Sequence, residues 1–171
     1  MSLNGRVALV TGAGRGIGRA IAAALAKDGA DIAVNYRRDD DAAAEAVAEI
    51  QAAGGKAKAY CASVDNLDEV TAMVADIGRE MGPIGILINN AGIASRGQSV
   101  ADTEPTEMER VMRVHAFGPF YLSKLVIPMM RDLGRGDIIM ISSVATDSYG
   151  AFGNPYNMGK AAMEALAFTM A

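Results

Sequence analysis

The chain of 171 residues has one cysteine, one histidine and no tryptophan, and its 16 basic residues are outnumbered by 20 acidic ones. The lone cysteine, Cys61, has no partner for an intramolecular disulfide, and its apolar surroundings AKAYCASV predict a small buried side chain. The net charge of -4 provides no general attraction for nucleic acid or anionic lipid. We therefore expect neither a nucleic-acid partner nor a membrane partner.

Long apolar runs and a charged-then-apolar leader are also missing. Glycine, proline or charged residues interrupt each hydrophobic stretch before it reaches the roughly 18 residues that suggest a membrane-spanning helix. These absences predict a soluble, cytoplasmic protein. Because 51% of the residues are hydrophobic and no linker or repeat divides the chain, residues 1–171 are expected to form a single domain.

Short apolar runs alternate with longer stretches of helical spacing. This alternation indicates right-handed crossovers and an α/β fold, with three layers, in which helices cover both faces of a doubly wound parallel sheet of five strands. The runs are apolar throughout, which is typical of strands covered on both faces. The expected strands are RVALVTG, DIAVNY, KAKAYCAS, IGILINNAG and GDIIMISSVA, and the expected helices cover residues 16–28, 40–53, 66–81, 106–133 and 155–171.

The second helix opens on Asp39, Asp40 and Asp41. Acidic residues are favourable at the positive N-terminal end of a helix. A metal site would need further ligands, and no histidine or additional carboxylate is placed to supply them. The three aspartates are therefore interpreted as a helix start, and no metal is expected.

A glycine-rich turn links the first strand to the first helix in VALVTGAGRGIGRAIAAAL. Glycines let backbone N–H groups approach a phosphate, and a helix N-terminus adds a favourable dipole. The strict G-x-G-x-x-G spacing is not met, but T-G-x-x-x-G-x-G is present through Thr11, Gly12, Gly16 and Gly18. A turn without a ligand is the alternative, and the strand–turn–helix context favours a dinucleotide.

The end of the second strand bears on the choice of nicotinamide cofactor. An acidic residue there would bind the ribose hydroxyls of NAD. Tyr36 occupies that place instead, and Arg37 and Arg38 follow it. Together with Arg15 in the glycine turn, these arginines are candidates to bind the 2′-phosphate of NADP. The alternative is a solvated turn before the three aspartates, so NADP(H) is expected and NAD(H) is less favoured.

Tyr156 and Lys160 are four residues apart in PYNMGKAAMEALAF, and residues at this spacing share one helix face. A phenol has a pKa near 10, and a neighbouring ammonium favours its ionised form. Ser143 lies thirteen residues before Tyr156, at the carboxyl end of the fifth strand, where open parallel sheets bind ligands. The Tyr-Lys pair alone fits an ordinary helix equally well, but its combination with a dinucleotide loop indicates acid–base chemistry.

The motifs TGAGRGIG, NNAG at residues 89–92, and ISS followed by Y-x-x-x-K occur here in one order. In these motifs and their order, the sequence resembles members of the short-chain dehydrogenase/reductase family over nearly the whole chain. The resemblance implies a Rossmann-like fold and hydride transfer between NADP(H) and a carbonyl or secondary alcohol, with 3-oxoacyl-acyl-carrier-protein reductases as the most similar subclass. A sugar or other alcohol dehydrogenase, or a non-catalytic dinucleotide-binding or sensor protein, stays an alternative. A homodimer or homotetramer is also implied.

The resemblance also assigns roles to residues. Ser143 would hydrogen-bond the substrate oxygen, Tyr156 would donate a proton to it, and Lys160 would hold the nicotinamide ribose. Ser142 is expected to be structural. The expected cofactor-binding residues are Gly12, Arg15, Gly16, Ile17, Gly18, Tyr36, Arg37, Ser63, Val64, Asn90, Ala91, Gly92, Tyr156 and Lys160.

The sequence departs from the family pattern in three places. Ser63 stands where the family usually offers an aspartate to the adenine, and His115 stands where many members carry an asparagine that orders a water for the lysine. We expect His115 to be structural with partial relay capacity. Family members also continue into a sixth strand, a substrate loop and a seventh strand, whereas this sequence stops at Ala171 and leaves its fifth strand as an exposed edge.

Overall fold

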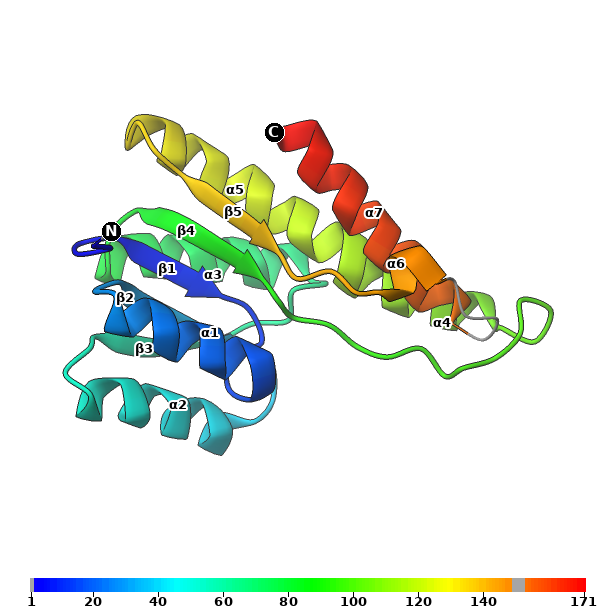
Figure 1. Cartoon of the computed structure of the whole chain (residues 1–171), viewed down its shortest axis with the longest axis horizontal. Coiled ribbons are helices and arrows are strands. Elements are labelled where there is room, and N and C mark those ends of the chain that lie inside the picture. Colours follow the sequence, from blue (N-terminus) through cyan, green and yellow to red (C-terminus); the bar gives the residue numbers. More distant parts are fainter. Residues whose placement is uncertain (1, 149–152) are drawn as a thin grey trace.

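The computed structural model describes residues 2–148 and 153–171, and it contains one parallel sheet with the strand order β3-β2-β1-β4-β5 (Figure 1). The strands are β1 Val7–Val10, β2 Asp31–Tyr36, β3 Ala57–Cys61, β4 Ile84–Asn89 and β5 Asp137–Met140. The helices are α1 Gly16–Lys27, α2 Asp40–Ala52, α3 Leu67–Glu80, α4 Pro105–Met112, the π-helix η1 Arg113–Phe117, α5 Gly118–Asp132, α6 Ala145–Ser148 and α7 Asn154–Met170.

The sheet is doubly wound, as the sequence predicted. The chain progresses outward from β1 through β2 to β3, and then returns to place β4 against the other side of β1. The strand order therefore reverses between β1 and β4. Such a reversal leaves a crevice at the carboxyl ends of the two strands, which is where open α/β sheets bind ligands.

Alternate residues of the strands point to opposite faces of the sheet and build two cores. On one face, Leu9 and Leu87 pack in a buried cluster with Ile77 of α3 and Leu122 of α5. On the other face, Val10 and Ile88 belong to a cluster that also contains residues of α1 and α2. Figure 1 shows the resulting three layers, and α7 packs against α4 and η1. The predicted three-layer α/β fold is confirmed.

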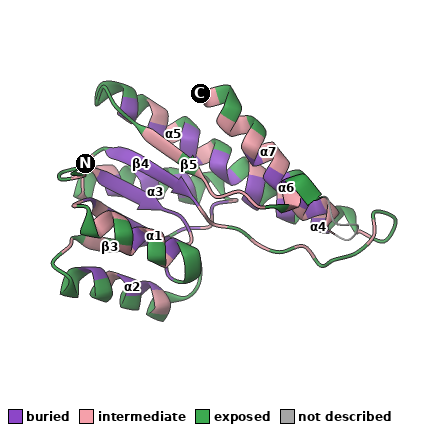
Figure 2. Ribbon diagram, viewed as in Figure 1, coloured by how far each residue is buried: buried purple, intermediate pink, exposed green. Residues whose placement is uncertain are grey.

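Burial distinguishes the inner strands from the two at the edges (Figure 2). All residues of β1 and β4 are buried, whereas β5 has no fully buried residue and Ile139 is 48% exposed. Only Tyr60 of β3 is buried. The expectation that all five strands are covered on both faces is therefore wrong at the edges. Cys61 at the end of β3 is exposed, so its predicted burial is also wrong.

The predicted helix over residues 106–133 is divided in three. Between α4 and α5, the five residues of η1 follow the wider π-helical hydrogen-bond pattern. Such short π-helical turns insert one extra residue into a helix and often occur at functional sites. His115 lies in this turn. The short helix α6 was not predicted.

The start of α2 confirms the interpretation of the aspartates. Asp39 is the N-cap, and its carboxylate accepts a hydrogen bond of 3.1 Å from the N–H of Ala42. Asp40 and Asp41 lie in the first turn, where negative charge is favourable. Among the residues that the structure describes, no helix is long and apolar enough to cross a membrane.

Candidate nucleotide and proton-transfer site

The glycine turn after β1 has the conformation that its residues predict. Gly12 and Gly16 have φ angles of 63° and 57°, in the left-handed region that favours glycine. A Cβ on Gly18 would lie 2.5 Å from the carbonyl oxygen of Gly12 and 2.6 Å from Nδ2 of Asn90. The N-cap of α1, Arg15, provides no side-chain cap, so the first-turn N–H groups are available to an anion.

Thr11 joins the glycine turn to the NNAG segment after β4. Its Oγ1 donates to the carbonyl oxygen of Ile88 at 3.2 Å and accepts from the backbone N–H groups of Asn90 and Ala91, both at 2.9 Å. Asn90 Nδ2 in turn donates to the carbonyl oxygen of Thr11 at 2.8 Å. The two loops at the switch point of the sheet are thus held as one unit.

A cavity of about 800 Å³ opens over these loops. Its lining includes the ends of β1, β2, β3 and β4, so the predicted cofactor-binding segments come together. Gly18 is buried and does not line the cavity, and Tyr156 and Lys160 belong to a separate part of the site. The predicted residues that line the cavity are Gly12, Arg15, Gly16, Ile17, Tyr36, Arg37, Ser63, Val64, Asn90, Ala91 and Gly92.

Sequence reasoning missed Asn35, which is only 1% exposed and lines the same cavity. Its Oδ1 accepts from the N–H of Gly12 at 3.3 Å, and its Nδ2 donates to the carbonyl oxygen of Ala62 at 3.0 Å. The amide therefore fixes the ends of β2 and β3 against the glycine turn. The signal in the sequence was a polar residue inside the apolar run DIAVNY.

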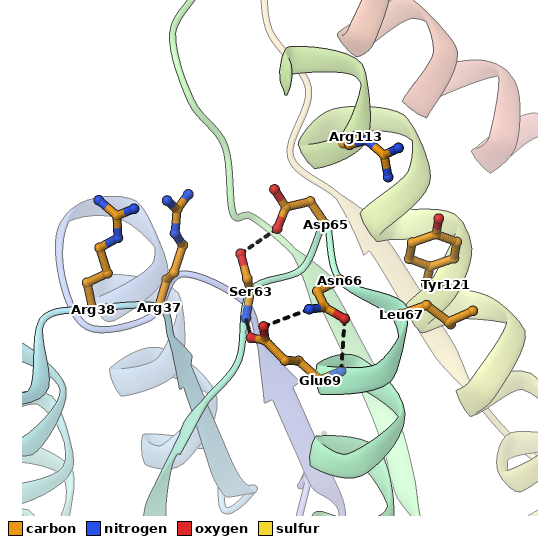
Figure 3. A pocket seen from close by; sticks show the side chains of 9 residues that line it. All are labelled: Arg37, Arg38, Ser63, Asp65, Asn66, Leu67, Glu69, Arg113 and Tyr121. Carbon is orange, nitrogen blue, oxygen red and sulfur yellow. Dashed lines mark hydrogen bonds between the residues drawn. The ribbon is translucent and has the colours of Figure 1, made fainter. Parts of the chain in front are cut away.

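Arginines gather at the end of the cavity next to β2. Arg37 and Arg38 are exposed and also line an adjoining hollow of about 660 Å³, which Arg113 faces from the opposite side (Figure 3). In the part of the chain that the structure describes, neither Arg37 nor Arg38 forms an ion pair, unlike Arg6, Arg19, Arg79, Arg96, Arg110 and Arg135. Nearby, a hydrogen bond with Asp40 raises the pKa of Tyr36 to about 12. The tyrosine is thus a neutral hydroxyl at neutral pH and does not repel a phosphate.

Ser63, after the end of β3, is bound by two neighbouring carboxylates. Its hydroxyl donates to the carboxylate of Asp65, and its backbone N–H donates to Oε2 of Glu69 at 2.7 Å (Figure 3). The neighbouring carboxylates therefore engage both polar groups of this serine.

Tyr156, Lys160 and His115 form a compact group on the other side of the switch point. The rings of His115 and Tyr156 meet edge to face, with centroids 5.1 Å apart and planes at 82°. Nζ of Lys160 lies 5.9 Å from the centroid of the Tyr156 ring and donates to the carbonyl oxygen of Ile141 at 2.5 Å. The i,i+4 spacing on α7 thus places the phenol and the ammonium in one group, as the sequence predicted.

Burial disfavours positive charge in this group. The loss of solvation lowers the pKa of Lys160, which is 3% exposed, while Glu164 raises it in part. Loss of solvation also lowers the pKa of His115; its hydrogen bond with Ile93 opposes this effect, and the charge of Lys160 adds to it. His115 is therefore neutral at pH 7.

His115 fastens η1 to the segment after NNAG. Its Nε2 lies 2.8 Å from the carbonyl oxygen of Ile93 and 3.2 Å from the backbone nitrogen of the same residue. The two contacts need opposite protonation states of Nε2, and the shorter one favours Nε2–H donating to the carbonyl. Nδ1 is then an acceptor, and it is buried without a hydrogen-bond partner among the described residues.

Ser143 lies in the segment between β5 and α6. Its hydroxyl accepts a hydrogen bond of 3.2 Å from the N–H of Ala145, so its own proton stays available to a ligand. The neighbouring Ser142 donates its proton to Oε1 of Glu164. The hydroxyl proton of Ser142 is therefore used within the protein, whereas that of Ser143 is available to a ligand. This difference agrees with a structural role for Ser142.

Comparison with known proteins gives a consistent result. Residues 6–171 match the short chain dehydrogenase family. Versicolorin reductase 1 of Aspergillus parasiticus is 43% identical over 141 residues, which cover 82% of this chain and 53% of that protein. A 3-oxoacyl-[acyl-carrier-protein] reductase of Synechocystis sp. is 39% identical over 174 residues, covering 99% of this chain and 68% of that protein.

Among solved structures, a metagenomic short-chain oxidoreductase in complex with NADP has a TM-score of 0.95 at 34% identity, covering 100% of this chain and 77% of that one. The chain belongs to the short-chain dehydrogenase family. It spans little more than half the length of the versicolorin reductases that it matches.

The cavity fits the nicotinamide dinucleotide that this family implies. A pyrophosphate needs close backbone approach at a helix N-terminus, and the positive-φ glycines and the uncapped start of α1 provide it. A Cβ on Gly16 would meet no atom within 4 Å, so the turn leaves open space above the helix start. The arginines at the end of β2 supply positive charge to the lining of the cavity.

Proposed function

We propose that this chain provides the cofactor-binding and proton-transfer groups of an NADP(H)-dependent oxidoreductase that interconverts a carbonyl and a secondary alcohol. The observation that carries the proposal is the packing of Tyr156 with Lys160 and His115. His115 in turn contacts Ile93, which lines the switch-point cavity. Family membership supports the reaction class.

The proposed roles follow from the chemistry of each side chain. A bound nicotinamide would supply or accept the hydride. During reduction, Ser143 donates a hydrogen bond to the carbonyl oxygen, and Tyr156 gives its proton to that oxygen. This step leaves a phenolate, which the neighbouring ammonium of Lys160 stabilises. Oriented donors of this kind favour the developing alkoxide over the carbonyl.

The arginines support NADP(H) over NAD(H). Arg37, Arg38 and Arg15 line one end of the cavity, and guanidinium groups suit a phosphate dianion. No acidic side chain ends β2, since Tyr36 is its last residue. The NADP complex of the structural relative agrees with this choice.

The substrate class is proposed from the relatives. Both relatives named above are reductases, one of a 3-oxoacyl group on acyl carrier protein. We propose a 3-oxoacyl thioester as the first substrate to test, and a sugar or another secondary alcohol as the second.

The proposed assembly is a homodimer or homotetramer. The side chains of Phe117 and Phe120 are 48% and 49% exposed, and Tyr121 contacts both rings. Light scattering of the purified protein at several concentrations tests the assembly, and a monomer at all of them contradicts it.

The decisive experiment for the reaction is the Tyr156→Phe variant. Removing the proton donor is expected to lower kcat for NADPH-dependent ketone or thioester reduction by about 100-fold to 10,000-fold. Binding of adenosine 2′,5′-bisphosphate should stay unchanged, because this probe has no nicotinamide and its two phosphates use only the glycine turn and the arginines. The matched control is Tyr60→Phe, which removes a hydroxyl bonded to Glu80 at a residue that does not line the cavity.

Each outcome discriminates between the alternatives. Turnover that survives in Tyr156→Phe contradicts the acid–base role. Tight dinucleotide binding without any turnover in the purified protein favours the non-catalytic sensor instead.

A further inference from the structure

Two segments that are distant in the sequence carry the proposed chemistry. Ser143 follows β5, whereas Tyr156 and Lys160 lie on α7, which begins at Asn154. For the serine and the tyrosine to act on one oxygen atom, these segments must be held in a fixed relative position. Proximity contributes to catalysis only when the geometry is kept within a fraction of an ångström.

Glu164 lies one turn beyond Lys160 on α7 and contacts the serine segment on both sides of Ser143. Its Oε1 accepts the hydroxyl proton of Ser142 and a second hydrogen bond of 3.0 Å from Oγ1 of Thr146. Two residues of the segment are therefore attached to a single carboxylate oxygen on the helix.

Thr146 extends this attachment to Ser143 itself. Its Oγ1 lies 2.8 Å from the carbonyl oxygen of Ser143 as well as 3.0 Å from Glu164. A hydroxyl has one proton, so the two acceptors share it. The backbone N–H of Thr146 also donates to the carbonyl oxygen of Ser143, at 3.2 Å. The backbone of the serine is thus tied to Glu164 through one side chain.

Lys160 provides the other attachment, because its Nζ donates to the carbonyl oxygen of Ile141. Successive turns of α7 therefore hold the segment at residue 141 and at residues 142 and 146. Hydrogen bonds to a charged group are stronger than those between neutral groups. Both attachments benefit, because one uses the ammonium of Lys160 and the other uses the carboxylate of Glu164.

We propose that Glu164 is a positioning residue that holds Ser143 in register with Tyr156 and Lys160 by binding Ser142 and Thr146. It touches none of the reacting atoms itself. The assignment rests on the function proposed above, and it also explains why two serines stand side by side. Ser142 gives its proton to Glu164, and Ser143 keeps its own for the substrate oxygen.

The test compares Glu164→Ala with Glu164→Gln, because a glutamine amide oxygen can still accept both hydroxyl protons. We expect Glu164→Ala to lower kcat about 10-fold to 100-fold, the range that displacement of a reacting group produces. Glu164→Gln should recover most of this loss. Glu109→Ala, an exposed glutamate on α4, is the matched control and should behave as the wild type.

A double-mutant comparison separates positioning from general stabilisation. Ser142→Ala combined with Glu164→Ala should be no slower than Glu164→Ala alone, because both changes break the same contact. Affinity for adenosine 2′,5′-bisphosphate should change less than about 2-fold, since the arginine end of the cavity lies on other elements. A parallel loss of kcat and of this affinity in Glu164→Ala would mark a purely structural residue and overturn the proposal.

Hydrogen–deuterium exchange tests the tether without any turnover. In Glu164→Ala, the amides of residues 142–148 should exchange faster than in the wild type, and in Glu164→Gln they should keep their protection. Unchanged exchange in Glu164→Ala overturns the proposal, whatever the activity. Failure of the proposed function shows itself separately, as turnover that does not depend on Tyr156.

Discussion

The imidazole of His115 meets the phenol ring of Tyr156 edge to face, with 5.1 Å between the ring centroids. The contact joins the π-helical turn η1 to the helix that carries the proposed acid. Such an arrangement is favourable for two rings beyond the area that they bury. Because the His115 side chain also binds the backbone of Ile93, one residue links α7, η1 and the NNAG segment.

Replacing His115 by alanine should therefore weaken the fold. The change empties a site of 0% exposure and leaves the backbone carbonyl of Ile93 without its donor. We expect a loss of about 2–4 kcal/mol in the free energy of unfolding, measured by urea denaturation. His115→Asn keeps a polar group for Ile93 and should cost less. Equal losses in the two variants would contradict the hydrogen-bonding role.

The pH dependence of stability tests whether the pKa of His115 is lowered in the folded protein. Burial lowers its pKa below the ordinary value of 6.5, so the unfolded chain binds the proton more readily than the folded protein does. Stability is therefore fully present above about pH 6.5 and falls as the pH drops below that value. His115→Asn should show a shallower fall between pH 6.5 and 5. A slope identical to that of the wild type would show that this histidine titrates freely.

The glycine turn gives a steric prediction. A Cβ on Gly18 would lie 2.5 Å from the carbonyl oxygen of Gly12, so Gly18→Ala must displace the backbone of the turn. We expect a lower melting temperature and loss of adenosine 2′,5′-bisphosphate binding by calorimetry.

The control for this change is Gly78→Ala, inside α3. A Cβ there would meet only Cε of Met129, at 3.8 Å. Alanine is a better helix former than glycine by about 0.8–1.0 kcal/mol, so this variant should be more stable than the wild type and bind the probe normally. A Gly18→Ala protein that also binds normally would show that the turn can relax.

Local patterns in the sequence were sufficient to predict the parallel sheet and the glycine turn. Apolar runs of strand length define β1, β2 and β4 because these strands are buried on both faces. The same apolar character led to a wrong prediction of burial at β3 and β5, which are edge strands. The predicted burial of Cys61 was wrong for this reason. Whether a strand lies at the edge depends on the strand order, and a single short apolar run does not determine that order.

The π-helical turn and the role of Glu164 lay beyond sequence reasoning. The turn at residues 113–117 accompanies the contact between His115 and Ile93, 22 residues earlier in the chain. The Ser142–Glu164 contact also spans 22 residues. In both cases the pairing depends on the path of an irregular segment, for which no periodicity exists.

Arg37 and Tyr36 should determine the preference for NADPH over NADH. Arg37→Ala removes a guanidinium from the phosphate end of the cavity. A charge-assisted hydrogen bond contributes about 1.5–3 kcal/mol, so the Kd for NADPH should rise about 10-fold to 100-fold while that for NADH stays nearly constant.

Tyr36→Asp should reverse the preference, because a carboxylate repels the 2′-phosphate and binds the ribose hydroxyls. Fluorescence titration measures both. An equal rise for the two cofactors would place the phosphate elsewhere.

Glu107 should hold the segment after NNAG in place. Its carboxylate is 3% exposed and accepts hydrogen bonds of 2.8 Å and 2.9 Å from Nε and Nη2 of Arg110, together with one of 3.0 Å from the N–H of Arg96. Arg110 also donates to the carbonyl oxygen of Ala94 at 3.1 Å. The segment that leads away from the cavity is thus fixed to α4 through one buried carboxylate.

Removing this charge should lower stability in a pH-dependent way. The Arg110 hydrogen bonds hold the pKa of Glu107 below its usual 4.5, so the stabilisation is present above that pH and is lost as the pH falls through the lowered pKa. Glu107→Gln should therefore melt earlier than the wild type at pH 7, and the difference should shrink below pH 4. Glu109→Gln, exposed on the same helix, should melt like the wild type at both pH values. A Glu107→Gln deficit that is constant down to pH 3 would mean that packing, rather than charge, is the cause.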